Sequence, residues 1–184
     1  GIVTWNVLSQ GISNPKRKQL MWGDTRELNE QMMTVVKCLN RILNMDVHVV
    51  CLQEFGGALG WDNYFNYRSL REHMAGMTGS VKVYKGEDIL PGGGRPKPDG
   101  SMPPSLSQVK SEPNSWLFFR PEKGRATLIR ASVIDSSRIM SSSEFTALSS
   151  LLEVSRIGQS STVVQLPLVV NGVKFVTRVI NVHD

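Results

Sequence analysis

Two strand-like segments separated by one amphipathic helical segment are the feature that most constrains the fold of this chain. Residues 2–8 and 47–52 are short apolar runs of the kind that form strands buried on both faces. Between them, apolar residues recur at helical spacing up to about Asn44, and residues 24–27 (Asp-Thr-Arg-Glu) have the form of a capping box. The recurring apolar residues are Leu28, Met32, Val35, Leu39, Ile42 and Leu43. This order of elements predicts a sheet with the helix packed on one of its faces.

The middle of the chain combines further elements with one segment of unusual composition. By the same criteria we expect a helix over 63–74, strands over 81–84, 115–120 and 126–134, and one helical turn around 145–152 within a polar stretch, 136–155. Residues 86–114 are rich in proline, glycine and serine, a composition that buries too little apolar surface to offset the entropy lost on ordering. Because strand-like sequence resumes beyond it, we interpret 86–114 as a flexible insertion within a single domain, residues 1–184.

A β-hairpin is predicted over 162–182. Its two arms flank Asn171-Gly172, the strongest short-range signal for a two-residue hairpin turn. Pro167 lies in the first arm and has no backbone N–H to donate, which indicates a sheet edge or a bulge at that point.

Composition narrows the class of protein. Hydrophobic residues make up 40% of the chain and charged residues 20%, and no apolar run approaches the length of a membrane span. The formal net charge of +5 suits a phosphate-rich partner, because a cationic surface gains affinity by releasing counterions from a nucleic acid. Cys38 and Cys51 lie in apolar settings and are interpreted as reduced core thiols; two cysteines and three scattered histidines give no zinc-site spacing. An intracellular protein is favoured, since no targeting signal is visible.

Three apolar segments each end in a polar residue suited to phosphodiester chemistry. Asn6 follows the first strand, Glu54 follows the second, and His183 follows the second arm of the hairpin. Ligands of α/β sheets bind at the carboxyl ends of strands, and one carboxylate with water and phosphate oxygens is a normal way to hold Mg²⁺. A donor such as histidine, aimed at a phosphate, stabilises the charge that grows in the transition state.

Each of these residues also has a simpler interpretation. A strand-end glutamate can cap a loop or pair with a surface lysine, and an asparagine can end a strand by bonding its own turn. Taken one at a time, Asn6, Glu54 and His183 fit such structural roles better than catalytic ones.

In their order and context, however, these motifs resemble those of a known family. Asn-Val-Leu at the first strand, Leu-Gln-Glu at the second and Asn-x-His after the hairpin are similar to the endonuclease/exonuclease/phosphatase superfamily, and most to its carbon-catabolite-repressor-type deadenylase branch with nocturnin and Angel. The similarity is good over residues 1–55, patchy over 115–135 and fair over 157–183. It rests on residues 6–10, Trp22, Arg26 and residues 46–54, and more loosely on 117–120 and 163–166.

The resemblance implies an α/β fold of two mixed β-sheets packed face to face with outer helices, a four-layer α/β/β/α sandwich that is incomplete at the C-terminus of this chain. It also implies a hydrolase that cuts phosphodiester bonds with Mg²⁺, or Mn²⁺ in its place, and a deadenylase-like 3′-exoribonuclease acting on RNA. Glu54 corresponds to the metal-binding glutamate of the family. Asn6 corresponds to the motif asparagine near metal and phosphate, and His183 to the histidine on the scissile phosphate, so that both would serve catalysis and substrate binding.

The chain also departs from the pattern of this family. The Asp-x-Asn and Ser-Asp-His motifs of the family lie downstream of the position of His183, and neither occurs here. Trp116 and Gly158 stand where the deadenylase branch has a small residue and an asparagine. Two alternatives therefore stay open: a catalytically inactive binding or assembly module on the same fold, and a phosphatase or lipid phosphodiesterase, since fold does not fix substrate.

We predict that the 184-residue chain alone does not turn over RNA, because the nucleophile-orienting aspartate and the final histidine of the family are missing from it. Incubation of the purified chain with labelled RNA and Mg²⁺ should leave the RNA intact. Cleavage that is abolished in Glu54→Ala would contradict this expectation.

Overall fold

The computed structural model describes residues 1–7, 28–55, 67–77, 79, 81–90, 96–122, 124–138, 153–157 and 161–182. Its elements, in chain order, are β1 (Ile2–Asn6), α3 (Leu28–Leu43), β2 (Val49–Phe55), α4 (Tyr67–Ala75), β3 (Lys82–Lys85), α5 (Gly86–Ile89), α6 (Leu106–Ser111), β4 (Ser115–Glu122), β5 (Gly124–Arg130), the 3₁₀ turns η2 (Ala131–Val133) and η3 (Ser136–Arg138), β6 (Glu153–Ile157), β7 (Ser161–Val170) and β8 (Val173–Val182). No helix among the described residues is both long and apolar enough to cross a membrane.

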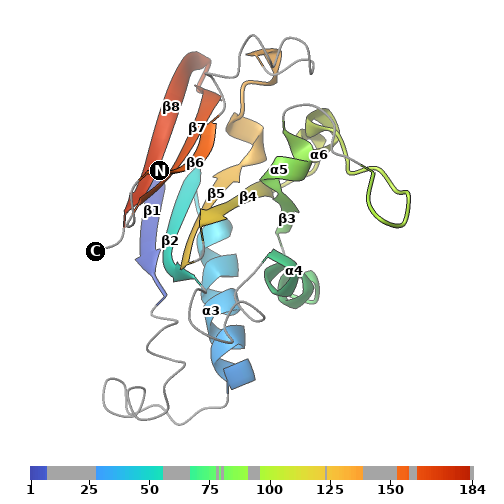
Figure 1. Cartoon of the computed structure of the whole chain (residues 1–184), viewed down its shortest axis with the longest axis vertical. Coiled ribbons are helices and arrows are strands. Elements are labelled where there is room, and N and C mark those ends of the chain that lie inside the picture. The colour runs from blue at the N-terminus through green and yellow to red at the C-terminus, as the bar shows by residue number, and fades with distance from the viewer. Residues whose placement is uncertain are drawn as a thin grey trace.

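The strands form two sheets that pack against each other (Figure 1). The larger sheet has the order β1-β2-β5-β4-β3 and is mixed, with β1 parallel to β2 and β3 parallel to β4, while β5 runs antiparallel to both of its neighbours. The smaller sheet, β6-β7-β8, is antiparallel throughout. Helices α3 and α4 cover the face of the larger sheet that points away from the smaller one (Figure 1). The expected class, α/β with two sheets face to face and helices outside, is confirmed.

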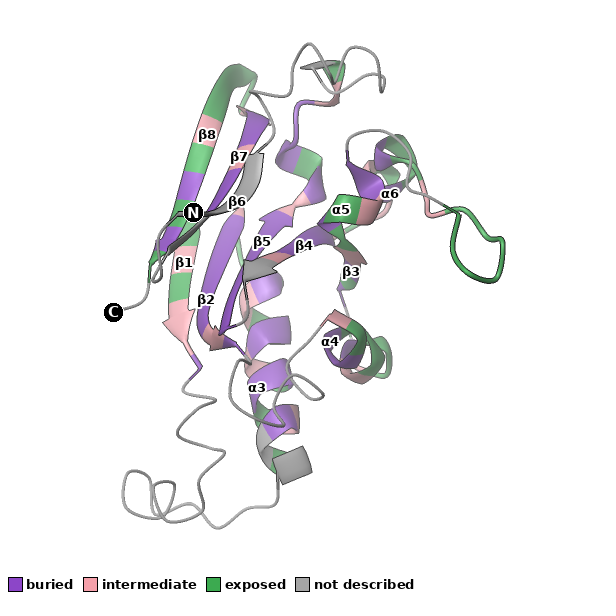
Figure 2. Cartoon of the chain, in the orientation of Figure 1, coloured by how far each residue is buried: buried purple, intermediate pink, exposed green. Residues whose placement is uncertain are grey.

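The predicted strand–helix–strand unit is present as β1, α3 and β2. The apolar stripe of α3, which includes Met32, Val36 and Leu39, is fully buried against the larger sheet. Alternation along β2 then divides the core: Val50 faces the helices, and its neighbour Cys51 faces the smaller sheet. In Figure 2 buried residues accordingly make up most of β2 and β5 and the first part of β4. The capping box expected at 24–27 lies outside the described residues.

One expectation about the first strand is wrong. We expected residues 2–8 to be buried on both faces, but β1 is the edge strand of the larger sheet, and Ile2 is 72% exposed. An apolar run signals a strand but does not say how many neighbours the strand will have.

Segment 86–114 is more structured at its two ends than its composition suggests. It begins with α5 and ends after α6, whose N-cap Ser105 and N3 residue Gln108 form a reciprocal capping box. The expectation that the segment buries too little apolar surface is wrong there, since Ile89, Leu90, Leu106 and Val109 all join the core between the sheets. At Gly86 a Cβ atom would lie 2.1 Å from the ring of Phe119, so only glycine fits.

The hairpin is confirmed as β7 and β8. Asn171 and Gly172 have φ of 50° and 77°, the two left-handed residues that a type I′ turn requires. Pro167 lies beyond Gln165, the last β7 residue that pairs with β6, and its carbonyl accepts from the Asp135 N–H rather than from β8. Strand β7 is the central strand of its sheet, but the position of the missing N–H lies on the β6 side beyond the end of β6, so β7 has a local edge at Pro167. Strand β6 itself was not expected, because its first three residues lie within the polar stretch 136–155.

Arg130 at the end of β5 ties the turn between α3 and β2 to the rest of the sheet. Its guanidinium lies 4.5 Å from the ring centre of Trp116 and donates four hydrogen bonds of 2.6–3.1 Å. Two of these bonds satisfy carbonyl groups at or just beyond the C-terminal end of α3, which have no partner within the helix. The acceptors are the carbonyls of Leu43, Met45 and Val47 and Oδ1 of Asn114.

We predict that Arg130→Lys lowers the free energy of unfolding by about 2 kcal/mol, because lysine keeps the charge but cannot reproduce the fork of donors. Denaturant unfolding measures this change. The control is Arg41→Ala, on the exposed side of α3, which should change stability by less than about 0.5 kcal/mol. Equal losses in the two variants would contradict the role of Arg130.

Candidate active site at the ends of β1, β2 and β8

Three strands from the two sheets end close together. Strands β1 and β2 are parallel with Asn6 opposite Gln53, so their carboxyl ends lie at one edge of the larger sheet. Asn181, next to the end of β8, contacts Gln53 across the space between the sheets at 2.8 Å. His183 follows β8 directly and lies outside the described residues.

Asn6 and Glu54 are in contact, as the strand order requires. The amide Nδ2 of Asn6 donates to Oε1 of Glu54 at 3.2 Å, and both residues are half-buried. The bond joins residues 48 positions apart and fixes one carboxylate oxygen relative to the end of β1. Two of the three residues predicted from the sequence are thus brought together.

Glu54 has a backbone conformation that is uncommon for its residue type. Its φ is 53°, in the left-handed region, and it lies at a β-bulge where Gln53 pairs with Arg125 and Phe55 with Gly124. A bulge turns a side chain out of the regular alternation, and such bulges are frequent beside active sites. Left-handed conformations of non-glycine residues are strained and persist where the surroundings hold them. The bulge therefore identifies Glu54 as a candidate site residue independently of any sequence motif.

A buried polar network lies directly behind Glu54. Gln53 Nε2 donates both to Thr4 Oγ1 at 2.9 Å and to Asn181 Oδ1 at 2.8 Å. Asn181, only 1% exposed, donates through Nδ2 to the carbonyls of Leu52 at 3.0 Å and Ala126 at 3.1 Å. One set of hydrogen bonds therefore links β1, β2 and β5 of the larger sheet to β8 of the smaller one.

The same side of the sandwich carries a cavity of about 420 Å³ between β1 and β8. Its walls include Thr4, Gln53 and Asn181 of the network together with the exposed Ile2, Ile180 and Val182. The polar network thus borders an open, mainly apolar hollow.

Glu54 and Asn6 fit a site for a hard divalent cation. The donor set at this position is oxygen-based, a carboxylate with a neighbouring amide, which suits Mg²⁺ more than zinc. Among the described residues, no group of three or more His, Cys, Asp or Glu side chains lies close enough to hold a metal. Any cation here would take Glu54 as its acidic ligand from the described part of the chain.

Several other residues considered from the sequence have structural roles. Trp116, Phe118 and Phe119 are buried core residues, as their alternation in a strand indicated. Cys38 and Cys51 are free thiols, as expected, and burial raises the pKa of Cys51.

Gln53 and Asn181 are the residues that sequence reasoning missed. Each is an amide inside an otherwise apolar strand end, one residue before Glu54 and two before His183. That placement was the available signal, but pairing them requires knowing how the two sheets pack.

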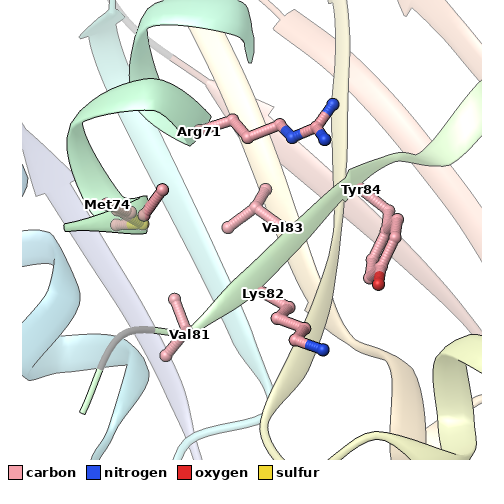
Figure 3. Close-up of a pocket in the computed structure, with 7 residues that line it drawn as sticks. Arg71, Met74, Val81, Lys82, Val83 and Tyr84 are labelled. Atoms are coloured by element: carbon pink, nitrogen blue, oxygen red, sulfur yellow. The ribbon is translucent and has the colours of Figure 1, made fainter. Parts of the chain in front are cut away.

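A second cavity, of about 380 Å³, lies beside the opposite edge strand, β3 (Figure 3). Met74, Val81 and Val83 give it an apolar wall, and Arg71 extends across it (Figure 3). At its other side Tyr84 donates to Glu112 at 2.8 Å, and Lys82 pairs with the same carboxylate oxygen at 3.0 Å. Desolvation, followed by the bond to Glu112, raises the pKa of Tyr84 to about 12.

Comparison with protein-family models, curated proteins and solved structures gives no match to this chain.

The raised pKa of Tyr84 predicts a loss of stability in alkali. An unfolded tyrosine ionises near pH 10, whereas folded Tyr84 holds its proton until about pH 12. The stabilisation is complete below pH 10 and is lost as the pH rises through 10 to 12. The unfolding free energy of Tyr84→Phe should therefore fall less between pH 9 and pH 11.5 than that of the unmodified protein. Parallel curves for the two proteins would refute the assignment.

Proposed function

We propose that this chain belongs to a divalent-metal-dependent phosphodiesterase that acts on RNA. The observation that carries the proposal is the contact of Asn6 with Glu54 at a bulge, where β1 and β2 end and β8 ends beside them. This arrangement gathers the motifs that resemble the endonuclease/exonuclease/phosphatase superfamily. They come from distant parts of the sequence, and the packing of the two sheets adds the end of β8 to the paired ends of β1 and β2.

In this proposal Glu54 holds Mg²⁺ and Asn6 orients the carboxylate. A bound Mg²⁺ would supply Lewis-acid polarisation of a phosphoryl oxygen and neutralise charge on the leaving oxygen. The Asn6 amide fixes Glu54 Oε1 by donating to it, and its neutral character allows it to lie beside a phosphate without adding charge. His183, carried over from the resemblance, would donate to the scissile phosphate.

RNA is proposed as the substrate on two grounds. The net charge of +5 favours a polyanionic partner, and the motifs are most similar to those of deadenylases. A deadenylase-like 3′-exoribonuclease is the form of the activity that the resemblance favours.

The alternative is a non-catalytic module that binds RNA or protein on the same scaffold. It is favoured because, among the described residues, no group of three or more His, Cys, Asp or Glu side chains lies close enough to hold a metal. The two proposals differ in whether binding of RNA depends on the metal.

We predict that the chain binds Mn²⁺, used as a probe for Mg²⁺, through Glu54. Glu54→Gln should raise the Kd for Mn²⁺ by at least about tenfold, and Asn6→Ala by about tenfold, since partners that orient a ligand typically contribute that much. Electron paramagnetic resonance of free Mn²⁺ gives the Kd directly. Glu72→Gln, which removes an exposed carboxylate paired with Arg68 on α4, is the matched control and should leave the Kd unchanged.

A labelled single-stranded RNA then separates the two functions. Under the phosphodiesterase proposal, Mg²⁺ strengthens RNA binding by the unmodified chain but not by Glu54→Gln, as fluorescence anisotropy would record. RNA binding that is the same with and without Mg²⁺ would favour the non-catalytic module. A Kd for Mn²⁺ that is equal in Glu54→Gln and the unmodified chain would reject the metal site itself.

A further inference from the structure

We propose that Gln53 and Asn181 are positioning residues that hold Glu54 in its left-handed conformation at the bulge. The inference extends the proposed function by naming the residues that position Glu54. Its prediction for the affinity of metal binding rests on that proposed function. Neither residue needs to touch metal or substrate to act in this way.

Asn181 bonds to two paired carbonyl groups of the larger sheet. Its two donor bonds go to the carbonyls of Leu52 and Ala126, which are opposite each other in the β2–β5 ladder. This is the second pair before the register shift between Gln53 and Phe55. Asn181 therefore clamps both strands just ahead of the bulge at Glu54.

Gln53 is held by hydrogen bonds from its side chain to strands of both sheets. Its side-chain amide is fixed on one side by Thr4 of β1 and on the other by Asn181 of β8. Gln53 is 7% exposed and directly precedes Glu54 in the chain. The Gln53 side chain is held by hydrogen bonds toward the smaller sheet. The backbone after Gln53 therefore cannot easily shift along β5 to restore regular pairing at Glu54.

The bulge at Glu54 needs the support of these hydrogen bonds. A glutamate with φ of 53° occupies a sparsely populated conformation, which persists only when its surroundings determine it. Behind Glu54 the surroundings are the amide network. Apolar replacements of the same size would fill the space between the sheets, but they would not hold the ladder carbonyls or Thr4.

A consequence of the network is that the smaller sheet sets the geometry of a site built on the larger one. Asn181 lies on β8, and the two amides have three further hydrogen-bond partners: Thr4 on β1, Leu52 on β2 and Ala126 on β5 of the larger sheet. A shift of β8 along the sandwich would therefore be transmitted to Glu54 through Gln53.

The test replaces Asn181 by leucine, which has the same branched shape, is somewhat larger and has no hydrogen-bonding groups in its side chain. We expect the Cα and carbonyl chemical shifts of Glu54, which report its φ in NMR spectra, to leave the values typical of positive φ. The Kd for Mn²⁺ should rise by about tenfold. Gln53→Met is the second variant and should produce the same two changes if Asn181→Leu does not fold.

The control is Leu168→Ala in β7, which creates a cavity in the same inter-sheet core but touches none of the network. It should lower the unfolding temperature while the NMR shifts of Glu54 and the Kd for Mn²⁺ stay as they were. A merely structural role for Asn181 would make its leucine variant behave like this control.

The two readouts separate the two proposals. If Glu54 keeps its positive-φ shifts in Asn181→Leu and Gln53→Met, the positioning role is overturned, whatever the metal does. If the unmodified chain binds no Mn²⁺ but both variants release Glu54 from its conformation, the positioning role holds and the proposed metal site fails.

Discussion

The burial of the larger sheet on both faces is the constraint on which the rest of this structure depends. Helices α3 and α4 cover one face and the smaller sheet covers the other, so that β2 is buried along nearly its whole length. A polar group inside such a strand needs a partner within the protein, because burial deprives it of most of its contact with water. Gln53 meets this requirement through Thr4 and Asn181, and Glu54 meets it by leaving the ladder at a bulge. Within β2, the polar side chains of Gln53 and Glu54 therefore lie at the carboxyl end of the strand.

The opposite end of β2 is held by a different device. Arg130 takes the unpaired carbonyls of the turn after α3 and lies over Trp116, so that α3, β2, β4 and β5 are joined through one guanidinium. Burial lowers the pKa of Arg130 from its ordinary value, yet an arginine stays charged at any ordinary pH. With its start fixed by Arg130 and its end fixed by the amide network, β2 has a defined register. In that register Glu54, rather than Gln53 or Phe55, is the residue at the bulge.

Sequence reasoning could reach the parts of this fold that depend on local pattern. The helical stripe of α3, the apolar run of β2 and the Asn171-Gly172 turn each carry their own signal, and all three were predicted. The errors have one physical cause, which is that burial depends on neighbours that sequence patterns do not name. Ile2 is exposed because β1 has one neighbour, and Leu106 is buried because α6 returns to the core from a proline-rich segment. The site divides in the same way: Asn6 and Glu54 could be paired from the order of β1 and β2, whereas Gln53 and Asn181 meet only because two sheets pack.

The pair of buried amides, Gln53 and Asn181, supports the proposal of a functional site at this end of the sandwich. Replacing both partners of a buried hydrogen bond by apolar groups of the same shape can be neutral or stabilising, so stability alone gives no reason to place two amides between the sheets. The free-energy cost of burying two amides is understandable where their directional hydrogen bonds fix groups that apolar packing cannot fix. Here they hold two ladder carbonyls and the residue before Glu54, directly behind a strained glutamate that contacts Asn6. A core designed only for stability would have no use for that strain. The proposed metal site would give that strain a role, because the site would present one carboxylate at a fixed position.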